Sequence, residues 1–534
     1  MKIHLLGISF SIIVFFSACR PVQPVREIAP TRTEIIASTL KDERLQTITP
    51  TAEPTSVSTD LHRPSNTPEV TQNSNPTPSQ TKIPSPTPSR SNETTSNRKV
   101  TKTLLFKMNP SNSVIKEVSP DGYQLALVVQ EMDGQYVLID EMKYGPYDQI
   151  IRLYFSPDSR HLAYIANRGD KAFVVIDGVE QNYYDQIDRS NWSCEENPVF
   201  SPDGRRFAYT ASNNNERFVV VDGIEGKRYP SIGNGIWFSP DSQHIVHMAA
   251  NINGESLLVI DGEEGKPYDQ ISMGQCDGNY GYSPDGQHFA FIARDGGKWF
   301  VVYDGVEGKK YDDLQISQLI FSPDSKHFAY EAENDEEMFI VVDGIEQNKY
   351  DIALSPVFSP DSQHLAYAAR KDNKWFVVVD GEEGKKYEGF IYGHLFSPDN
   401  QHLAYTVEKG NQEILVVDGD EYGPYDSIGG LFSPDSQRII LMYRDLDEGK
   451  HNLMENGKII GSYEFTFTPL FSPDSQHIVY VVPGEAKQFI VVDGTEGESY
   501  DEILDFGTLV FDSDSSFHII ARINDEFYLV EEVI

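Results

Sequence analysis

A ten-residue motif recurs along this chain from Val118 to the C-terminus and constrains its fold more than any other feature. One copy reads Phe-Ser-Pro-Asp-Ser-Gln-His-Leu-Ala-Tyr, at residues 358–367. The prolines of the intact copies, spaced 36 to 45 residues apart, are Pro120, Pro157, Pro202, Pro240, Pro284, Pro323, Pro360, Pro398, Pro434 and Pro473. An eleventh copy, at 511–515, has lost its proline. A fixed period of this size indicates one supersecondary unit copied many times, with each copy burying its apolar faces against its neighbours.

Two turns divide each repeat into four short strands. In the copy around Pro323, the sequence Ser-Pro-Asp-Ser at 322–325 predicts a type I turn, because proline presets φ at the second turn position and serine suits the first. Asp343-Gly344 further along is a hairpin signal. The first predicted strand of this copy ends at residue 321, and the other three lie around residues 326–330, 339–342 and 349–351.

The third strands carry the clue to the architecture. The strand Trp-Phe-Val-Val-Val at 375–379 does not alternate apolar with polar residues, which predicts burial on both faces. Four short antiparallel strands in roughly forty residues, buried on both faces, are typical of a β-propeller blade. A β-solenoid would have a shorter period and no hairpins. The sequence therefore predicts an all-β protein with about eleven four-stranded blades.

The repeat also resembles a known family. Ser-Pro-Asp-Gly/Ser, followed by a basic or polar pair and an apolar strand, is similar to the WD-like propeller repeat of the TolB type over residues 101–534. This resemblance implies a periplasmic or surface interaction module, although some propellers of this repeat type are lyases. The Gly-His…Trp-Asp signature of true WD repeats is missing from the sequence, so the hydrogen-bond network built on that histidine is not expected here.

The two ends of the array predict how it closes. The last copy stops after its third strand, at 527–530, while residues 103–106 (Thr-Leu-Leu-Phe) lie where a fourth strand belongs. We expect this N-terminal segment to complete the C-terminal blade and to seal both open edges. Because eleven blades exceed the usual four to eight in a ring, we favour two rings over one oversized ring.

The front of the chain predicts export and anchoring. Residues 1–18 contain a lysine and then an apolar run that is too short to span a membrane, as in a secretory signal peptide. Phe-Ser-Ala-Cys at 16–19 resembles a bacterial lipobox, which would place lipid on Cys19; ordinary secretion with Cys19 incidental is the alternative. Residues 19–100 are rich in Pro, Thr and Ser and contain no aromatic residue, which predicts a disordered tether. We expect the propeller, 101–534, to lie outside the cytoplasm, on the bacterial membrane or cell surface.

Charge and motifs limit the partners and the chemistry. Residues 101–534 hold 33 basic and 74 acidic side chains, which argues against nucleic acid and permits a cationic partner, although solubility alone accounts for such a charge. The sequence has no Gly-x-Ser-x-Gly nucleophile elbow and no Walker phosphate loop. Seven histidines occupy one repeated position, one per blade, where they cannot share a metal ion: His161, His244, His288, His327, His364, His402 and His477. We therefore predict no catalytic, cofactor or metal site.

Two cysteines lie in the longest connections between repeats. Cys194 and Cys276 each precede a motif proline by eight residues, which places them in equivalent loops two blades apart. A disulfide between them is one interpretation in an exported protein. Two free thiols are the alternative, because a blade's width separates the strands and a disulfide needs Cα atoms within about 7 Å.

The repeat predicts that the two faces of the propeller differ. The Ser-Pro-Asp turns and the Asp-Gly turns share one face, which we call the uniform face. The hairpins between second and third strands share the other, the variable face, with the blade-to-blade connections. Individual loops on a rigid scaffold usually carry recognition, and sequence drift is the competing explanation. The candidate binding residues on the variable face are Trp192, Tyr280, Arg294 and Asp295.

These observations favour a lipid-anchored, extracytoplasmic β-propeller that binds a protein or a glycan without catalysis. The main alternative is a polysaccharide lyase or hydrolase with a carboxylate or metal site at the ring mouth. A purely structural envelope protein is a third hypothesis. Sequence cannot show whether histidines and acids converge on one channel, which is the feature that would favour an enzyme.

Overall fold

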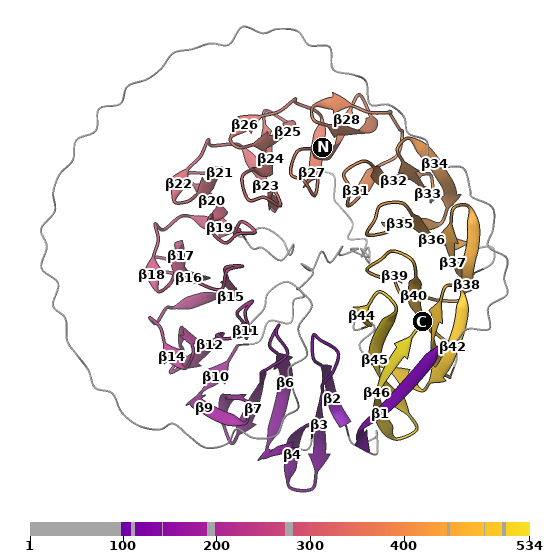
Figure 1. Cartoon of the computed structure of the whole chain (residues 1–534). Helices are drawn as coiled ribbons and strands as arrows, with labels where there is room; N and C mark the ends of the chain where they lie inside the picture. The colour runs from indigo at the N-terminus through magenta and orange to yellow at the C-terminus, as the bar shows by residue number, and fades with distance from the viewer. Residues whose placement is uncertain are drawn as a thin grey trace, which may run out of the picture. The chain divides into compact units, whose positions relative to one another are not determined.

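The computed structural model describes residues 98–107, 113–140, 142–188, 198–272, 281–445, 449–484, 486–504 and 509–534. Within these residues every regular element is a β-strand, numbered β1 to β46 and grouped into eleven sheets. Each sheet is one blade, and the blades form a ring with the first strand of each nearest the centre (Figure 1). In the described residues no helix is long and apolar enough to cross a membrane.

The inner half of each blade consists of its first and second strands, taken in blade order 1 to 11. First strands are β2 (Ser113–Val118), β6 (Gln149–Phe155), β10 (Gln186–Ile187) with β11 (Val199–Phe200), β15 (Ser231–Phe238), β19 (Gln270–Ser272), β23 (Asp313–Phe321), β27 (Ile352–Phe358), β31 (Ile391–Phe396), β35 (Ser427–Phe432), β39 (Leu470–Phe471), and β43 (Glu502–Ile503) with β44 (Val510–Ser513). Second strands are β3 (Leu125–Glu131), β7 (Leu162–Arg168), β12 (Phe207–Asn213), β16 (Ile245–Ala250), β20 (Ala290–Asp295), β24 (Phe328–Asn334), β28 (Leu365–Lys371), β32 (Leu403–Lys409), β36 (Ile439–Asp445), β40 (Ile478–Pro483) and β45 (Ser516–Ile523).

The outer half of each blade follows the same order. Third strands are β4 (Gly134–Ile139), β8 (Lys171–Ile176), β13 (Glu216–Val221), β17 (Ser256–Ile260), β21 (Lys298–Tyr303), β25 (Glu337–Val342), β29 (Lys374–Val379), β33 (Gln412–Val417), β37 (Lys450–Glu455), β41 (Gln488–Val492) and β46 (Glu526–Val533). Fourth strands are β5 (Met142–Tyr147), β9 (Val179–Tyr184), β14 (Ile224–Glu225), β18 (Glu263–Glu264), β22 (Val306–Glu307), β26 (Ile345–Glu346), β30 (Glu382–Glu383), β34 (Asp420–Tyr425), β38 (Lys458–Tyr463), β42 (Thr495–Tyr500) and β1 (Lys99–Lys107).

Blade 6 shows how local sequence sets these strands. The Ser325 N–H donates to the Ser322 carbonyl at 2.9 Å, which closes the predicted turn, and Ser325 has a φ of 64°. The Ser322 hydroxyl accepts the His327 N–H at 3.0 Å, so the first and second strands start in fixed register. Asp343 and Gly344 both have positive φ, at 49° and 78°, as a two-residue hairpin of the type favoured by strand twist requires. The four-strand blade predicted from sequence is confirmed.

The central strands are apolar on both faces because each face packs on a different neighbour. In β24 and β25 of blade 6, Ala329 and Ile340 pack with Tyr367 and Phe376 of blade 7. The alternate residues of the same strands, such as Phe339, pack with residues of blade 5. Stacking blades around an axis thus explains why these strands do not alternate apolar with polar.

The ring closes between the last and the first blade. Strand β1 pairs antiparallel with β46, with Thr103 opposite Leu529, so the N-terminal segment is the fourth strand of blade 11. A cluster containing Leu127, Ile520 and Phe527 then joins blade 11 to blade 1. The closure predicted from the chain ends is confirmed.

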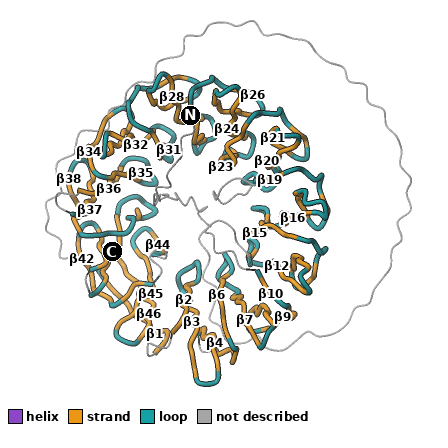
Figure 2. Tube along the Cα trace, turned by 180° about the vertical axis from the view of Figure 1, so that it is seen from behind, coloured by secondary structure: helices purple, strands orange, loops and turns teal. Residues whose placement is uncertain are grey.

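The prediction of two rings is wrong. Eleven apolar clusters, one at each junction, link the blades consecutively into a single ring. Figure 2 shows the same single ring from behind. The usual blade number reflects common wedge angles between blades, whereas closure depends only on each junction burying its own apolar face. Here every junction does so, which leaves no open edge to start a second ring.

Candidate functional site

The uniform face holds the blades together through its turns. In most blades the aspartate N–H of the Ser-Pro-Asp turn donates to the side chain that ends the same turn in the next blade. The bonds to serine Oγ, at 2.9–3.0 Å, join Asp121 to Ser159, Asp203 to Ser242, Asp285 to Ser325, Asp324 to Ser362, Asp399 to Ser436 and Asp435 to Ser475. Asp361 donates to Asn400 Oδ1 at 3.0 Å in the same way. In blade 3 the Ser201 hydroxyl also donates to the Asp203 carboxylate at 2.6 Å, which lowers the pKa of Asp203.

The seven repeated histidines lie on this face and pair within their own blades. His327 Nδ1 lies 2.7 Å from Asp343 Oδ2, and Asp343 Oδ1 accepts the Phe328 N–H at 3.0 Å. The same pair recurs at His161, His244, His288, His364, His402 and His477, with the aspartate of each Asp-Gly turn. These histidines therefore tie the second strand to the third-strand hairpin. The constant 16- or 17-residue spacing from histidine to aspartate could have predicted the pair.

Hydrogen bonds also join neighbouring blades on the variable face, but fewer groups take part in them. The aspartate that follows the fourth-strand tyrosine accepts an N–H from the hairpin between the second and third strands of the next blade. Asp148 accepts from Gly169 at 2.6 Å, and Asp351 accepts from Asp372 at 3.1 Å. Further examples are Asp185 with Asn214, Asp269 with Gly296, Asp312 with Asp335, and Asp501 with Asn524. The hairpins themselves differ from blade to blade in sequence and leave their tips exposed.

Of the predicted binding residues, the structure describes two. Arg294 and Asp295 end β20 on the variable face, where the Arg294 guanidinium lies 5.6 Å from the Trp299 ring. Asp295 lies 3.8 Å from the Lys310 ammonium group. Both predicted residues are therefore solvent-facing parts of one hairpin. Trp192, Tyr280, Cys194, Cys276 and Cys19 lie outside the described residues.

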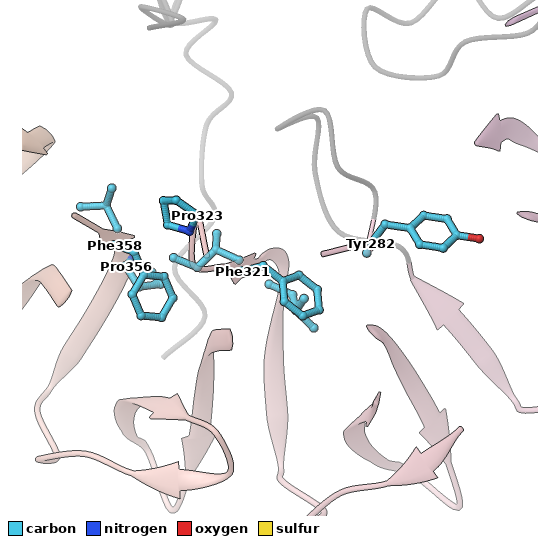
Figure 3. A pocket seen from close by; sticks show the side chains of 9 residues that line it. Tyr282, Phe321, Pro323, Pro356 and Phe358 are labelled. Carbon is cyan, nitrogen blue, oxygen red and sulfur yellow. The ribbon is translucent and has the colours of Figure 1, made fainter. Parts of the chain in front are cut away.

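Two hollows in the described residues were not predicted. The first, of about 190 Å³, is an apolar depression among the first strands of blades 5 to 7, bordered by Tyr282, Phe321, Pro323, Pro356 and Phe358 (Figure 3). The second, of about 570 Å³, lies between blades 7 and 8 on the variable face. It contains lysines and glutamates from both blades. A sequence signal existed, since Tyr387-Glu388-Gly389-Phe390 departs from the Tyr-Asp connection that seven of the repeats carry.

A short polar chain interrupts the apolar wall across blades 6 to 8. Glu331, 3% exposed, accepts the Ser355 N–H at 2.6 Å, and His394 hydrogen-bonds through Nε2 to the Ser355 carbonyl. Burial raises the pKa of Glu331 to about 7 and lowers the pKa of His394 to about 4. Perturbed groups of this kind cluster at functional sites, but they also occur in structural networks. Here both side chains bond to the backbone of Ser355 rather than to a common open site, and the buried Nδ1 of His394 has no hydrogen-bond partner among the described residues.

The described residues contain no group of three or more His, Cys, Asp or Glu side chains placed to hold one metal ion. The predicted absence of catalysis and cofactors stays a prediction.

Comparison with known proteins assigns this chain to no family. No protein-family model and no curated protein matches the chain. Among solved structures, it is similar to the crystal structure of a eukaryotic initiation factor, at 15% identity and a TM-score of 0.36, over 64% of this chain and 97% of that one. It is also similar to TolB from Acinetobacter baumannii, at 16% identity and a TM-score of 0.22, over 49% of this chain and 80% of that one. The chain is an eleven-bladed β-propeller with a weak structural likeness to TolB.

Proposed function

We propose that this protein is a non-catalytic binding module that presents its variable face to a protein or glycan partner. The observation that carries this proposal is the different use of the two faces. On the uniform face, the polar groups of most turns form hydrogen bonds between blades or within one blade. On the variable face the hairpin tips differ and are exposed; Met132 and Ile252, the most exposed large apolar residues described, are both at such tips. Individual loops on a rigid scaffold are suited to recognition.

Charge supports a basic surface on the partner. Residues 101–534 hold 33 basic and 74 acidic side chains, so the ring has a strong negative field. Such a field raises the association rate of a cationic partner, and salt weakens the effect because exposed charges are screened beyond about 8 Å at physiological ionic strength. The partner's association rate should therefore fall steeply as salt is raised.

A capture experiment tests which face binds. The full chain, immobilised and incubated with envelope extract, should retain a partner that the variant Arg294→Ala retains less well. Trp192→Ala and Tyr280→Ala test the same face, since aromatic and arginine side chains supply most binding hot spots. The matched controls are Glu307→Gln and Glu383→Gln on Asp-Gly turns, which lie in ion pairs with Lys266 and Lys386. A partner lost with the control variants and kept with Arg294→Ala would assign binding to the uniform face.

We also propose that lipid on Cys19 anchors the protein outside the cytoplasm, with residues 19–100 as a tether. The support is the apolar run that ends in Ser-Ala-Cys ahead of a segment rich in proline, threonine and serine. A tether of that length would span on the order of 50 Å as a coil. Cys19→Ala should move the protein from the membrane fraction to the soluble fraction. Equal membrane retention of that variant would contradict the anchor.

A further inference from the structure

The repeat shows how a carboxylate is held on the variable face. In six blades an aspartate from the preceding connection accepts the N–H at the start of the hairpin turn. In blade 7 this aspartate is Asp351, and the N–H belongs to Asp372. Backbone N–H groups in turns bind carboxylates well, because charge-assisted hydrogen bonds are stronger than neutral ones. Each of these blades therefore contains an occupied carboxylate position.

Blade 8 has lost that carboxylate through its backbone. Ile391 pairs with Val407 as Ala353 pairs with Ala369 in blade 7, but one more residue separates Ile391 from the preceding tyrosine. Gly389 consequently stands at the position of the aspartate. A Cβ added to Gly389 would lie 1.7 Å from the Glu408 carbonyl oxygen, so no side chain fits there without a backbone shift. The equivalent hairpin residue in blade 8, Gly410, has no acceptor for its N–H among the described residues.

The second hollow, of about 570 Å³, opens at this point and has the size of a ligand pocket. Gly410 and Lys409 form part of its wall, and Val407 and Ile414, both buried, form apolar parts of its lining. Tyr387 borders it from blade 7. The hollow thus combines an unpaired turn N–H, a cation and an apolar surface.

Most of the charges around the hollow are already paired. Lys385 is paired with Glu421 at 2.7 Å, Lys386 with Glu383 at 3.1 Å, and Glu388 with Lys374. Lys409 forms no ion pair among the described residues; after Lys385, it also contributes to lowering the pKa of Glu421, and it is the lysine of this wall that a ligand could pair with. Glu408, also on the wall, opposes a second negative charge. A single carboxylate is therefore favoured over a doubly charged phosphate.

We propose that this hollow between blades 7 and 8 binds the aspartate or glutamate side chain of an extended acidic peptide segment, which takes the place of the missing aspartate. A peptide is favoured over an acidic sugar because the occupant in the other blades is itself a peptide. In three connections it reads Tyr-Asp-Gln-Ile, at 147–150, 184–187 and 268–271. The tyrosine of such a segment would pack on the apolar lining while its aspartate meets Lys409 and the Gly410 N–H. The site lies on the variable face but takes an acidic segment, not the basic surface proposed above, so it goes beyond the proposed function and is tested separately from it.

Fluorescence anisotropy with the full chain tests the site. The probe is a fluorescein-labelled Gly-Tyr-Asp-Gln-Ile-Gly peptide, compared with the same peptide carrying asparagine. We expect the aspartate peptide to bind at least about five-fold more tightly, since a hydrogen bond to a charged group contributes more than a neutral one. Lys409→Met should remove that preference. Lys371→Met changes the equivalent residue of blade 7, where Asp351 already occupies the carboxylate position. This variant should keep the preference for the aspartate peptide.

Three results would overturn the proposal. The first is equal binding of the two peptides to the wild-type chain. The second is an equal loss with Lys409→Met and Lys371→Met, which would mean general attraction to surface lysines. The third is displacement of the peptide by a uronate oligosaccharide at lower concentration than by unlabelled aspartate peptide, which would assign the site to a glycan. Unchanged thermal unfolding of both variants confirms that they are folded.

Discussion

The junction that closes the ring differs from the junctions between consecutive blades. Between blades 6 and 7, the contact on the uniform face is the repeated turn bond from Asp324 to Ser362, at 3.0 Å. Between blades 11 and 1 the proline turn is missing, and His518 takes over. Its fully buried ring hydrogen-bonds through Nε2 to the Asp121 carbonyl at 2.7 Å and through Nδ1 to Asp512 at 2.8 Å. Tyr123 stacks on the imidazole with ring centroids 4.0 Å apart.

The closing blade also carries ion pairs between distant parts of the chain. Lys116 of blade 1 pairs with Glu502 of blade 11 at 2.7 Å, and Arg98, which directly precedes β1, pairs with the buried Glu532. Consecutive blades are already tethered by the backbone, so a modest repeated bond suffices there. Bringing the chain ends together costs loop-closure entropy, which grows with loop length. This comparison shows that the repeated bonds build the ring. Residues found only at the junction between blades 11 and 1, which we call the seam, close it.

The largest effect should come from removing the strand that completes blade 11. Deletion of residues 98–107 exposes the edge of β46 and removes Leu105 and Phe106, which uncovers apolar residues of the seam such as Phe527. We expect the melting temperature to fall by at least about 10 °C, because several kcal/mol of packing and pairing are lost at once. Differential scanning calorimetry measures this.

The control for that deletion removes the ten residues that precede Arg98 and should leave the melting temperature unchanged. If both deletions melt like the wild type, β1 contributes nothing to closure and the comparison between seam and ordinary junctions fails.

An ordinary junction that has lost its apolar pattern should show the next largest effect. Glu331 faces blade 7 at the position of Ile165 and Ile292 in other blades. The pKa of Glu331 in the folded state, about 7, lies above the ordinary value of 4.5. Between pH 4.5 and pH 7 the folded state therefore keeps a proton that the unfolded state has lost. Stability from this group is therefore present below about pH 4.5 and lost as pH rises to 7, by about 3 kcal/mol.

Glu331→Ile should remove this pH dependence. In urea unfolding, the free energy of unfolding of the variant relative to the wild type should rise by about 3 kcal/mol from pH 5 to pH 8. Glu331→Gln keeps an acceptor for the Ser355 N–H without the charge and should show the same gain. A constant difference at both pH values would mean that the carboxyl group titrates normally and that this junction is no weaker than the others.

Much of this fold follows from short-range sequence signals. The Ser-Pro-Asp and Asp-Gly turns fix their strands locally, and the apolar run at 375–379 predicts contact with two neighbours. Ring closure by 103–106 was predictable because the last repeat lacks one strand. The number of rings was not predictable, because it depends on the sum of the small angles between neighbouring blades at eleven junctions. No single residue determines that sum.

The candidate sites were less predictable than the fold. The hollow beside Lys409 arises from one inserted residue, and its effect appears only when the register of Ile391 against Val407 is known. Likewise, Glu331 lies in a strand whose sequence gives no sign of which neighbour it faces. Arg294 and Asp295 were predicted from exposure and residue type, which locate a surface but not a partner.

Loss of the unique seam contact should have an intermediate effect. Burial opposes protonation of His518, but its hydrogen bonds to Asp512 and Asp121 outweigh burial and raise its pKa. The stabilisation from its protonated form is fully present below the ordinary value near 6.5 and is lost as pH rises through the raised value. His518→Gln should therefore cost about 2 kcal/mol at pH 6 and less at pH 9, as measured by urea unfolding. A cost that grows with pH would show that the neutral imidazole closes the seam.

The smallest effect should come from one repeated turn bond, and it separates the repeat from the seam most sharply. Ser242 accepts the Asp203 N–H at 3.0 Å and has a φ of 63°. Ser242→Ala removes the acceptor and should cost about 1 kcal/mol. Ser242→Gly removes the same acceptor but relieves the left-handed backbone, so it should be nearly neutral. Gly204 and Gly286 already occupy this position in blades 3 and 5, which shows that the ring tolerates the loss of single turn bonds. A loss with Ser242→Gly as large as that with His518→Gln would mean that ordinary junctions depend on single contacts as much as the seam does.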